Sequence, residues 1–147
     1  EFRRVLFRSN LLHLTNWLVN GLPERFPKLK VVWIESGIAW LSFLMQRLDS
    51  EYMMRPSEAP LLRKRPSEYV LSGRYFQSIE VPEGEALTKS VIELVGDGIL
   101  MYASDYPHSE SHFPETAETA LKWKLPKPTM QKLMWDNALK LYARYSP

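Results

Sequence analysis

The sequence predicts an α/β domain in which a parallel β-sheet alternates with helices. Three short runs of apolar and β-branched residues have the length and composition of buried strands, and segments with apolar residues at helical spacing lie between them. The order along the chain is helix, strand, helix, strand, helix, strand, loop, helix. Strands that alternate with helices form parallel sheets, and such sheets bind ligands at the carboxyl ends of their strands.

The composition is that of a folded protein without thiol chemistry. The 147 residues are 45% hydrophobic and 24% charged, with 19 basic and 17 acidic side chains and no cysteine. This charge balance gives little support for nucleic-acid binding, and no apolar run approaches the roughly 20 residues that span a bilayer. We therefore expect a cytoplasmic protein without nucleic-acid or membrane partners. A metal ion would need His, Asp or Glu ligands, and the histidines are His13, His108 and His112.

The first half of the chain contains the first predicted strand and the helices on either side of it. Residues 1–10 interleave arginine with apolar residues, and we interpret them as a non-native extension, the alternative being a genuine basic strand or helix start. Residues 11–147 form the domain. A helix over 11–22 ends at Gly21 and Pro23, and a strand over 31–34 is closed by Glu35-Ser36-Gly37. An amphipathic helix follows over 38–55, and the proline-containing connection at 56–66 is a segment that could close over a site.

The second half repeats the strand and helix alternation. A strand is predicted over 75–81, and a helix over 85–95 buries Leu87, Val91 and Leu94. The third strand, over 99–103, leads into Ser-Asp-Tyr-Pro-His at 104–108. A last helix over 129–145 is expected to bury Met130, Leu133, Met134, Ala138, Leu141 and Tyr142.

Carboxylates lie at the carboxyl ends of all three predicted strands, as Glu35, Glu80 and Asp105. Because the carboxyl ends of parallel strands lie at one edge of the sheet, we expect Glu35 and Asp105 to line one cleft. Asp105 is the strongest candidate for a metal ligand or proton acceptor, since strand alternation through Ile99, Met101 and Ala103 would point it inward. The alternative is a turn in which Asp105 caps its own backbone.

Two further residues carry weaker functional hypotheses. Glu35 is an acid/base candidate, because a carboxylate at such a position must be paired or have its pKa raised, and the structural alternative is an N-cap contact to the following helix. His108 is a substrate-contact candidate, although a histidine in a proline-containing loop is more often only solvent-exposed. His112 is a weaker candidate, and His13, among leucines, is expected to be structural.

Several separated motifs, in one order, resemble amidohydrolase-related proteins of the branch that includes aminocarboxymuconate-semialdehyde decarboxylase-like enzymes. The resemblance runs from about Leu11 to Tyr145. The motifs are Phe26-Pro27-Lys28-Leu29-Lys30-Val31-Val32, Glu35-Ser36-Gly37-Ile38-Ala39-Trp40-Leu41, Arg47-Leu48-Asp49, Arg65-Pro66-Ser67-Glu68-Tyr69, Met101-Tyr102-Ala103-Ser104-Asp105-Tyr106-Pro107-His108 and Trp135-Asp136-Asn137-Ala138.

The resemblance implies the C-terminal part of a (β/α)8 TIM-type barrel, with the three strands here as about the sixth, seventh and eighth. It also implies a divalent metal, usually zinc, held by a His-x-His pair, a further histidine and an aspartate that Asp105 matches. No His-x-His occurs in this sequence, so the implied site is incomplete, and we expect the chain alone to be inactive and to bind no stoichiometric zinc. The inward face of Val31, Trp33, Met101 and Ala103 would then be uncovered.

The expected activity of the complete protein is hydrolysis of a C–N or C–O bond in a small polar organic substrate by metal-activated water. Metal-dependent decarboxylation is the alternative, although the decarboxylases carry a catalytic histidine where this chain has Glu35. A second alternative is a non-catalytic α/β interaction module. We expect the complete protein to be a homo-oligomer.

Overall fold

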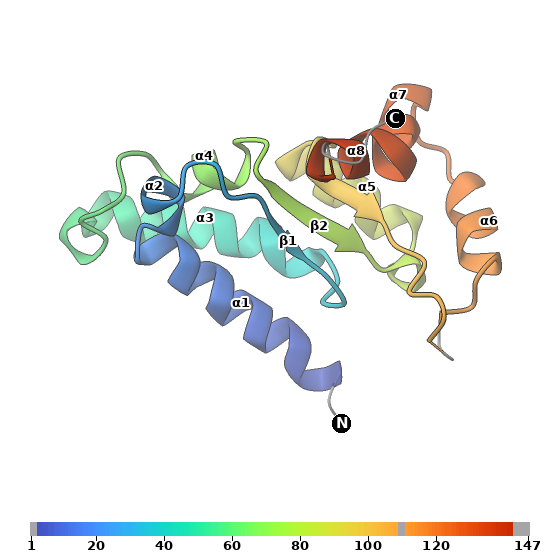
Figure 1. The fold of residues 1–147 in the computed structure, drawn as a ribbon, viewed down its shortest axis with the longest axis horizontal. Coiled ribbons are helices and arrows are strands. Elements are labelled where there is room, and N and C mark those ends of the chain that lie inside the picture. The colour runs from blue at the N-terminus through green and yellow to red at the C-terminus, as the bar shows by residue number, and fades with distance from the viewer. Residues whose placement is uncertain (1–2, 109–110, 143–147) are drawn as a thin grey trace.

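Three parallel strands form one sheet in the order β1-β2-β3 (Figure 1). The structure, a computed structural model, describes residues 3–108 and 111–142. Strand β1 is Val31–Trp33, β2 is Tyr75–Ile79 and β3 is Leu100–Tyr102, and β2 pairs in parallel with both neighbours. The parallel sheet predicted from the sequence is therefore confirmed, although each strand is shorter than predicted.

Helices connect the strands and cover one side of the sheet. In chain order they are α1 (Arg3–Val19), α2 (Leu22–Arg25), α3 (Ala39–Met54), η1 (Pro56–Glu58), α4 (Pro66–Val70), η2 (Val81–Glu83), α5 (Glu85–Val95), α6 (Glu115–Leu121), α7 (Lys127–Gln131), the π-helical η3 (Lys132–Asp136) and α8 (Asn137–Leu141). In this part of the chain no helix is long and apolar enough to cross a membrane.

The predicted helices between the strands are confirmed, and those at the ends of the chain differ. Helix α1 begins at Arg3 and passes through the expected boundary at Leu11 without a break, and whether residues 1–10 are native stays a prediction. The single helix predicted over 129–145 is instead α7, η3 and α8, and residues 143–147 lie outside the described part. The predicted burial of Leu94 and Tyr142 is wrong, because both side chains are exposed.

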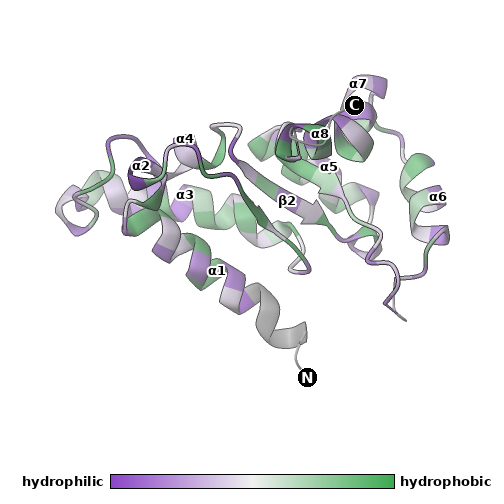
Figure 2. Cartoon of the chain, viewed as in Figure 1, coloured by the Kyte–Doolittle hydropathy of each residue, from purple (hydrophilic) through white to green (hydrophobic). Residues whose placement is uncertain are grey.

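The main core lies between the sheet and helices α1, α3 and α5. Tyr75 and Ile79 of β2 and Leu100 of β3 are almost completely buried there, together with Leu41 of α3 and Val91 of α5. Figure 2 shows apolar residues along α3 and α5, the two helices that run beside the strands. The helix-facing side of β2 is thus closed to solvent.

The four side chains predicted to form an uncovered inward face of the sheet do not all lie on that face. Val31 and Trp33 pair in register with Tyr75 and Gln77, so they share the helix-facing side and pack against the main core. The opposite face carries Met101, which pairs with Ser78 and is 6% exposed. The prediction that Val31, Trp33 and Met101 would be uncovered is therefore wrong, and only Ala103 of the predicted set is exposed.

Asparagine side chains bond to backbone carbonyls at the two open edges of the sheet. Asn137 of α8 is fully buried and its Nδ2 donates to Leu100 O at 2.8 Å, on the side of β3 that faces away from β2. Asn10 of α1 donates from Nδ2 to Ile34 O at 3.1 Å, just after β1. Each asparagine supplies a donor that a further strand would otherwise provide.

The connection at 56–66 lies at the opposite end of the sheet from Glu35. It leads into α4, which precedes β2, and it packs beside the segment that precedes β1 (Figure 1). The carboxyl ends of the strands, where Glu35 follows β1, are at the other end. The connection therefore does not cover the end of the sheet that carries Glu35, and its Ala59 and Leu62 instead line a cavity against α3.

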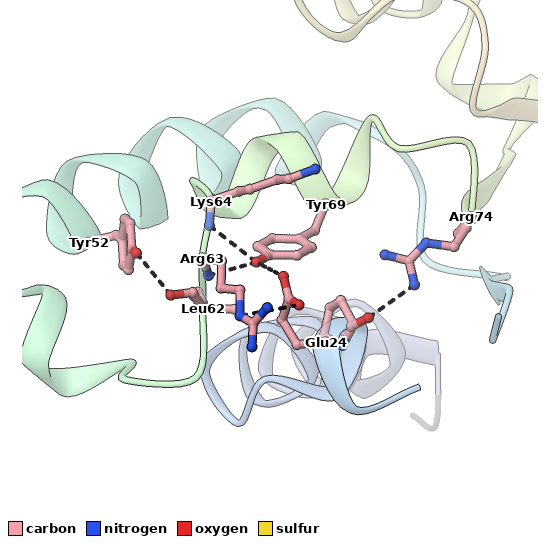
Figure 3. A network of polar contacts seen from close by, with 8 residues as sticks. Glu24, Tyr52, Leu62, Arg63, Lys64, Tyr69 and Arg74 are labelled. Carbon is pink, nitrogen blue, oxygen red and sulfur yellow. Dashed lines mark hydrogen bonds and ion pairs between the residues drawn. The ribbon is translucent and has the colours of Figure 1, made fainter. Parts of the chain in front are cut away.

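A buried tyrosine holds this connection in place (Figure 3). Tyr69 of α4 is 3% exposed, and its hydroxyl donates to Glu24 Oε1 of α2. The hydroxyl oxygen of Tyr69 also accepts hydrogen bonds from the backbone amides of Arg63 at 2.8 Å and Lys64 at 3.2 Å. Burial and the Glu24 carboxylate raise the pKa of Tyr69 above its ordinary value of 10.0, which keeps the hydroxyl protonated as a donor. One oxygen therefore links three separate segments.

We predict that Tyr69→Phe lowers the free energy of unfolding by about 1–3 kcal/mol, because two backbone amides and Glu24 lose their partner. Urea denaturation measures this change. The matched control is Tyr52→Phe, which removes one bond to Leu62 O and should cost about 1 kcal/mol or less. Equal losses in the two variants would contradict the linking role of Tyr69.

The C-terminal helices are fastened to the start of β3 by Asp97. Its Oδ2 accepts from Thr129 Oγ1 at 2.9 Å and its Oδ1 accepts from Lys132 Nζ at 2.8 Å. Its backbone carbonyl accepts from Asn137 Nδ2 at 2.7 Å. Burial tends to raise the pKa of Asp97, but the bonds from Lys132 and Thr129 outweigh it and hold the pKa below its ordinary value of 3.8.

We predict that Asp97→Asn costs about 1–3 kcal/mol at neutral pH and progressively less in acid. Because the folded-state pKa of Asp97 is lowered, the unfolded chain binds more protons in this range, and the stabilisation is lost as pH falls through the folded pKa. Urea denaturation at neutral pH and at about pH 3 measures the difference. Asp136→Asn, at a carboxylate that accepts from exposed Gln131, is the control. A pH-independent loss in Asp97→Asn would contradict the argument.

Candidate metal centre

Three side chains that can bind a metal ion meet at the carboxyl ends of the strands. Glu35 follows β1, and Asp105 and His108 follow β3. One ligand atom from each lies within 4.8 Å of the others. His108 Nδ1 lies 2.9 Å from Asp105 Oδ1, and the two side chains are 60% and 30% exposed. The prediction that Glu35 and Asp105 lie at the same end of the sheet is confirmed, whereas the cavity that Glu35 lines does not include Asp105.

Both carboxylates are carried by residues in the left-handed backbone conformation. Glu35 has φ of 56° and Asp105 has φ of 55°, which residues other than glycine adopt at a cost of about 1–3 kcal/mol. Strand β3 ends at Tyr102, so strand alternation does not reach Asp105 as the sequence argument assumed. The left-handed backbone, rather than the pleat of the strand, gives Asp105 its direction.

The turn after Asp105 brings His108 back to it. The backbone amide of His108 donates to Asp105 O at 2.9 Å, and the imidazole lies beside the carboxylate of the same residue. The alternative in which Asp105 only caps its own turn is therefore incomplete, because its carboxylate also faces a histidine and a glutamate from another strand. A turn explains the backbone but not the convergence of the side chains.

A cavity of about 380 Å³ opens beside this cluster. It is lined by Glu35, Ser36, Gly37, Ala39, Trp40, Glu80 and Glu83. Glu83 is half-buried, and this burial raises the pKa of its carboxyl above 4.5 although backbone amides of Ile38 and Glu80 favour the ionised form. Carboxylates and one indole therefore dominate the described wall of the cavity.

The donor set fits a divalent cation. Two carboxylates and one imidazole are ligands that zinc and manganese both accept, and three protein ligands leave open positions for water and substrate. The expectation of no stoichiometric zinc rested on the missing histidine ligands. The structure brings Glu35 and His108 to Asp105, so three side chains of this chain could hold a metal, and metal titration decides between the two expectations.

The remaining histidines do not join the site, and two polar residues were missed. His13 lies exposed on α1, and His112 is exposed in the loop before α6. Sequence reasoning passed over Gln77 and Ser78, which are buried under the Glu35 turn, and Glu35 N donates to Ser78 Oγ at 3.3 Å. Two polar residues inside the apolar strand Tyr75–Ile79 were the signal that could have identified them.

Comparison with known proteins gives one family and several similar structures. The profile of a family described as Amidohydrolase matches residues 7–144. No curated protein matches the chain. Similar solved structures include a 5-carboxyvanillate decarboxylase from Sphingomonas paucimobilis, with 25% identity, a TM-score of 0.70 and coverage of 86% of this chain and 37% of that one.

Two further structures extend the comparison. An amidohydrolase from Mycobacterium avium subsp. paratuberculosis is 25% identical with a TM-score of 0.76, and the match covers 92% of this chain and 34% of that one. A dihydroxybenzoic acid decarboxylase from Polaromonas sp., solved with manganese and the inhibitor 2-nitroresorcinol, is 16% identical with a TM-score of 0.77 and coverage of 96% and 42%. The chain thus spans well under half the length of these structures.

We predict that the chain binds one Zn²⁺ or Mn²⁺ and that Asp105→Asn abolishes this binding, because the central carboxylate of the cluster is lost. Isothermal titration calorimetry with each metal measures affinity and stoichiometry. Glu58→Gln removes an exposed carboxylate at the far end of the sheet and serves as the control. Binding that survives in Asp105→Asn would place the metal elsewhere.

Proposed function

We propose that this chain, which belongs to the amidohydrolase family, forms part of a metal-dependent enzyme that acts on a small polar organic substrate. The family resemblance predicted from the sequence motifs is confirmed. The observation that carries the proposal is the convergence of Glu35, Asp105 and His108 at the carboxyl ends of parallel strands, where such folds place their active sites. A non-catalytic interaction module would not require two strained residues to meet there.

The residues of this chain would hold the metal and move a proton. A divalent cation in such a site polarises the scissile carbonyl and makes water a better nucleophile. Asp105 would bind the metal and accept the proton that the attacking water loses, with His108 keeping the carboxylate oriented. Glu35 would be a further ligand, or the acid that returns the proton to the leaving nitrogen or oxygen.

Hydrolysis of a C–N or C–O bond is the reaction that the described wall of the site favours. In that reaction water adds to the carbonyl carbon, the bond to nitrogen or oxygen breaks, and the leaving atom takes up a proton. Glu35, Glu80 and Glu83 surround the cavity, whose described lining has no lysine or arginine. Carboxylates repel an anionic substrate, so an uncharged amide or ester suits this wall better than a free acid.

Decarboxylation is the second candidate, and the solved relatives favour it. The 5-carboxyvanillate decarboxylase shares 25% identity with this chain, and a second structure is a dihydroxybenzoic acid decarboxylase that binds manganese. A bound divalent cation would offset the carboxylates of the wall and let an aromatic acid approach. One similar structure, at 16% identity, contains manganese, whereas the motifs alone implied zinc.

The three strands would be the sixth to eighth of the barrel, and further ligands would come from sequence upstream of residue 1. The share of the solved structures that the chain spans, 34–37%, supports a partial barrel. We propose that the complete barrel is a homo-oligomer with a small-molecule substrate, and that the 147-residue chain alone is inactive, because its metal site lacks the upstream ligands.

The test uses the protein extended upstream through its reading frame, loaded in turn with zinc and manganese. We expect hydrolysis of simple aryl amides or esters, and the Asp105→Asn variant to lose at least about 100-fold in kcat/KM while retaining its fold. Release of carbon dioxide from dihydroxybenzoates or 5-carboxyvanillate, with no hydrolysis, would instead establish the second candidate.

The upstream sequence itself separates the enzyme from the interaction module. An apolar strand that ends in His-x-His would supply the ligands that this chain lacks. If no such pair is found and neither reaction is detected with either metal, the enzymatic proposal is wrong and the interaction module remains.

A further inference from the structure

The turn that carries Glu35 is fastened to the sheet by a side chain that the proposed chemistry does not use. Gln77 lies in the middle of β2 and is completely buried. Its Nε2 donates to Gly37 O at 2.8 Å and to Ser36 Oγ at 3.1 Å. These two acceptors belong to the residues that directly follow Glu35. One buried amide therefore holds the turn from beneath.

The other end of the same amide is also fixed. Gln77 Oε1 accepts from the hydroxyl of Tyr75 at 2.6 Å. Burial raises the pKa of Tyr75 well above its ordinary value of 10.0, so the hydroxyl keeps its proton and remains a donor. A flipped amide would set acceptor against acceptor at Gly37 O, whereas the Tyr75 hydroxyl could accept from the amide nitrogen as well as donate to its oxygen. The amide therefore has one orientation, with its nitrogen toward the turn.

Two further contacts act on the same turn. The backbone amide of Glu35 donates to Ser78 Oγ, and that of Ile38 donates to Glu83 Oε2 at 3.1 Å. Gly37 has φ of 67°, and a Cβ atom there would lie 2.4 Å from Glu83 Oε1. Backbone amides on either side of Ser36 and Gly37 are thus bonded to side chains of the sheet and of η2, and a side chain at position 37 would strain the backbone and displace Glu83.

We propose that Gln77 is a positioning residue of the metal centre, whose amide keeps Glu35 in the left-handed conformation that brings its carboxylate to Asp105 and His108. This inference rests on the proposed function insofar as the carboxylate serves as a ligand. Residues that orient a metal ligand typically contribute about 10–100-fold to metal affinity. Gln77 lies on the helix-facing side of β2, so it acts through the turn.

The experiment compares Gln77→Met with Tyr75→Phe in the 147-residue chain. Gln77→Met keeps a similar length but removes both donors to the turn, whereas Tyr75→Phe removes only the hydroxyl and leaves those donors in place. The first measurement is the amide-to-Hα coupling constant of Glu35 by NMR, which reports its φ angle. The second is the Mn²⁺ dissociation constant, together with the paramagnetic broadening of Glu35 and Asp105.

In Gln77→Met we expect a changed coupling constant at Glu35, a rise of about tenfold in the Mn²⁺ dissociation constant, and broadening that persists at Asp105 but falls at Glu35. Tyr75→Phe should keep all three close to wild type. An unchanged Glu35 coupling constant and affinity in Gln77→Met would overturn the proposal. Equal losses in the two variants would also overturn it, because they would indicate a general effect of the buried network.

The experiment remains decisive if the chain binds no Mn²⁺ or if Gln77→Met does not fold. If the wild-type chain binds no Mn²⁺, the prediction that this chain alone holds a metal is wrong, and the Glu35 coupling constant alone still decides whether Gln77 sets the turn. If Gln77→Met does not fold, Ser36→Ala takes its place, since it removes one acceptor of the amide at a partly exposed position. A change at Glu35 in Ser36→Ala supports the proposal, and no change overturns it.

Discussion

Strand β2 is the constraint on which the rest of the structure depends. All five of its residues are buried, and its backbone pairs with a parallel strand on each side. Tyr75 and Ile79 anchor the core against the helices, while Gln77 and Ser78 bond to the turn that follows β1. Strands β1 and β3 do not touch, being separated by about two strand spacings, or ~10 Å. The side chains of the candidate site can therefore meet only because loops from both strands bend over the end of β2.

The parts of the fold that local patterns determine could be predicted from the sequence. Helix α5 has clear apolar periodicity and ends at its C-cap Gly96, α3 buries Leu41, Leu44 and Met45 of its predicted stripe, and the parallel sheet follows from the alternation of these helices with apolar runs. The meeting of Glu35 and Asp105 was also predictable, because parallel strands share an end whatever their register. These inferences needed the order of the elements and no knowledge of tertiary contacts.

The parts that failed depend on tertiary contacts. Val31 and Trp33 were assigned to the wrong face because a three-residue strand that is apolar throughout has no alternation to read, and only its register with β2 decides. The left-handed backbone at Glu35 and Asp105 has no residue signal of the kind that glycine gives. Gln77 was missed although a polar residue in a buried strand is costly without partners and therefore informative.

The strain in these loops and the capacity to bind metal are two aspects of one arrangement. Each left-handed carboxylate raises the free energy of the folded chain by about 1–3 kcal/mol, which the surrounding bonds must offset. Bringing two carboxylates within 4.8 Å of each other adds repulsion between them. A bound divalent cation would attract both carboxylates and so outweigh the repulsion between them. Its binding energy would add to the stability of the folded state. Relaxing Glu35 to an ordinary conformation would relieve the strain and remove a ligand at once. The buried amide of Gln77 therefore opposes the conformational change that would most easily dismantle the site.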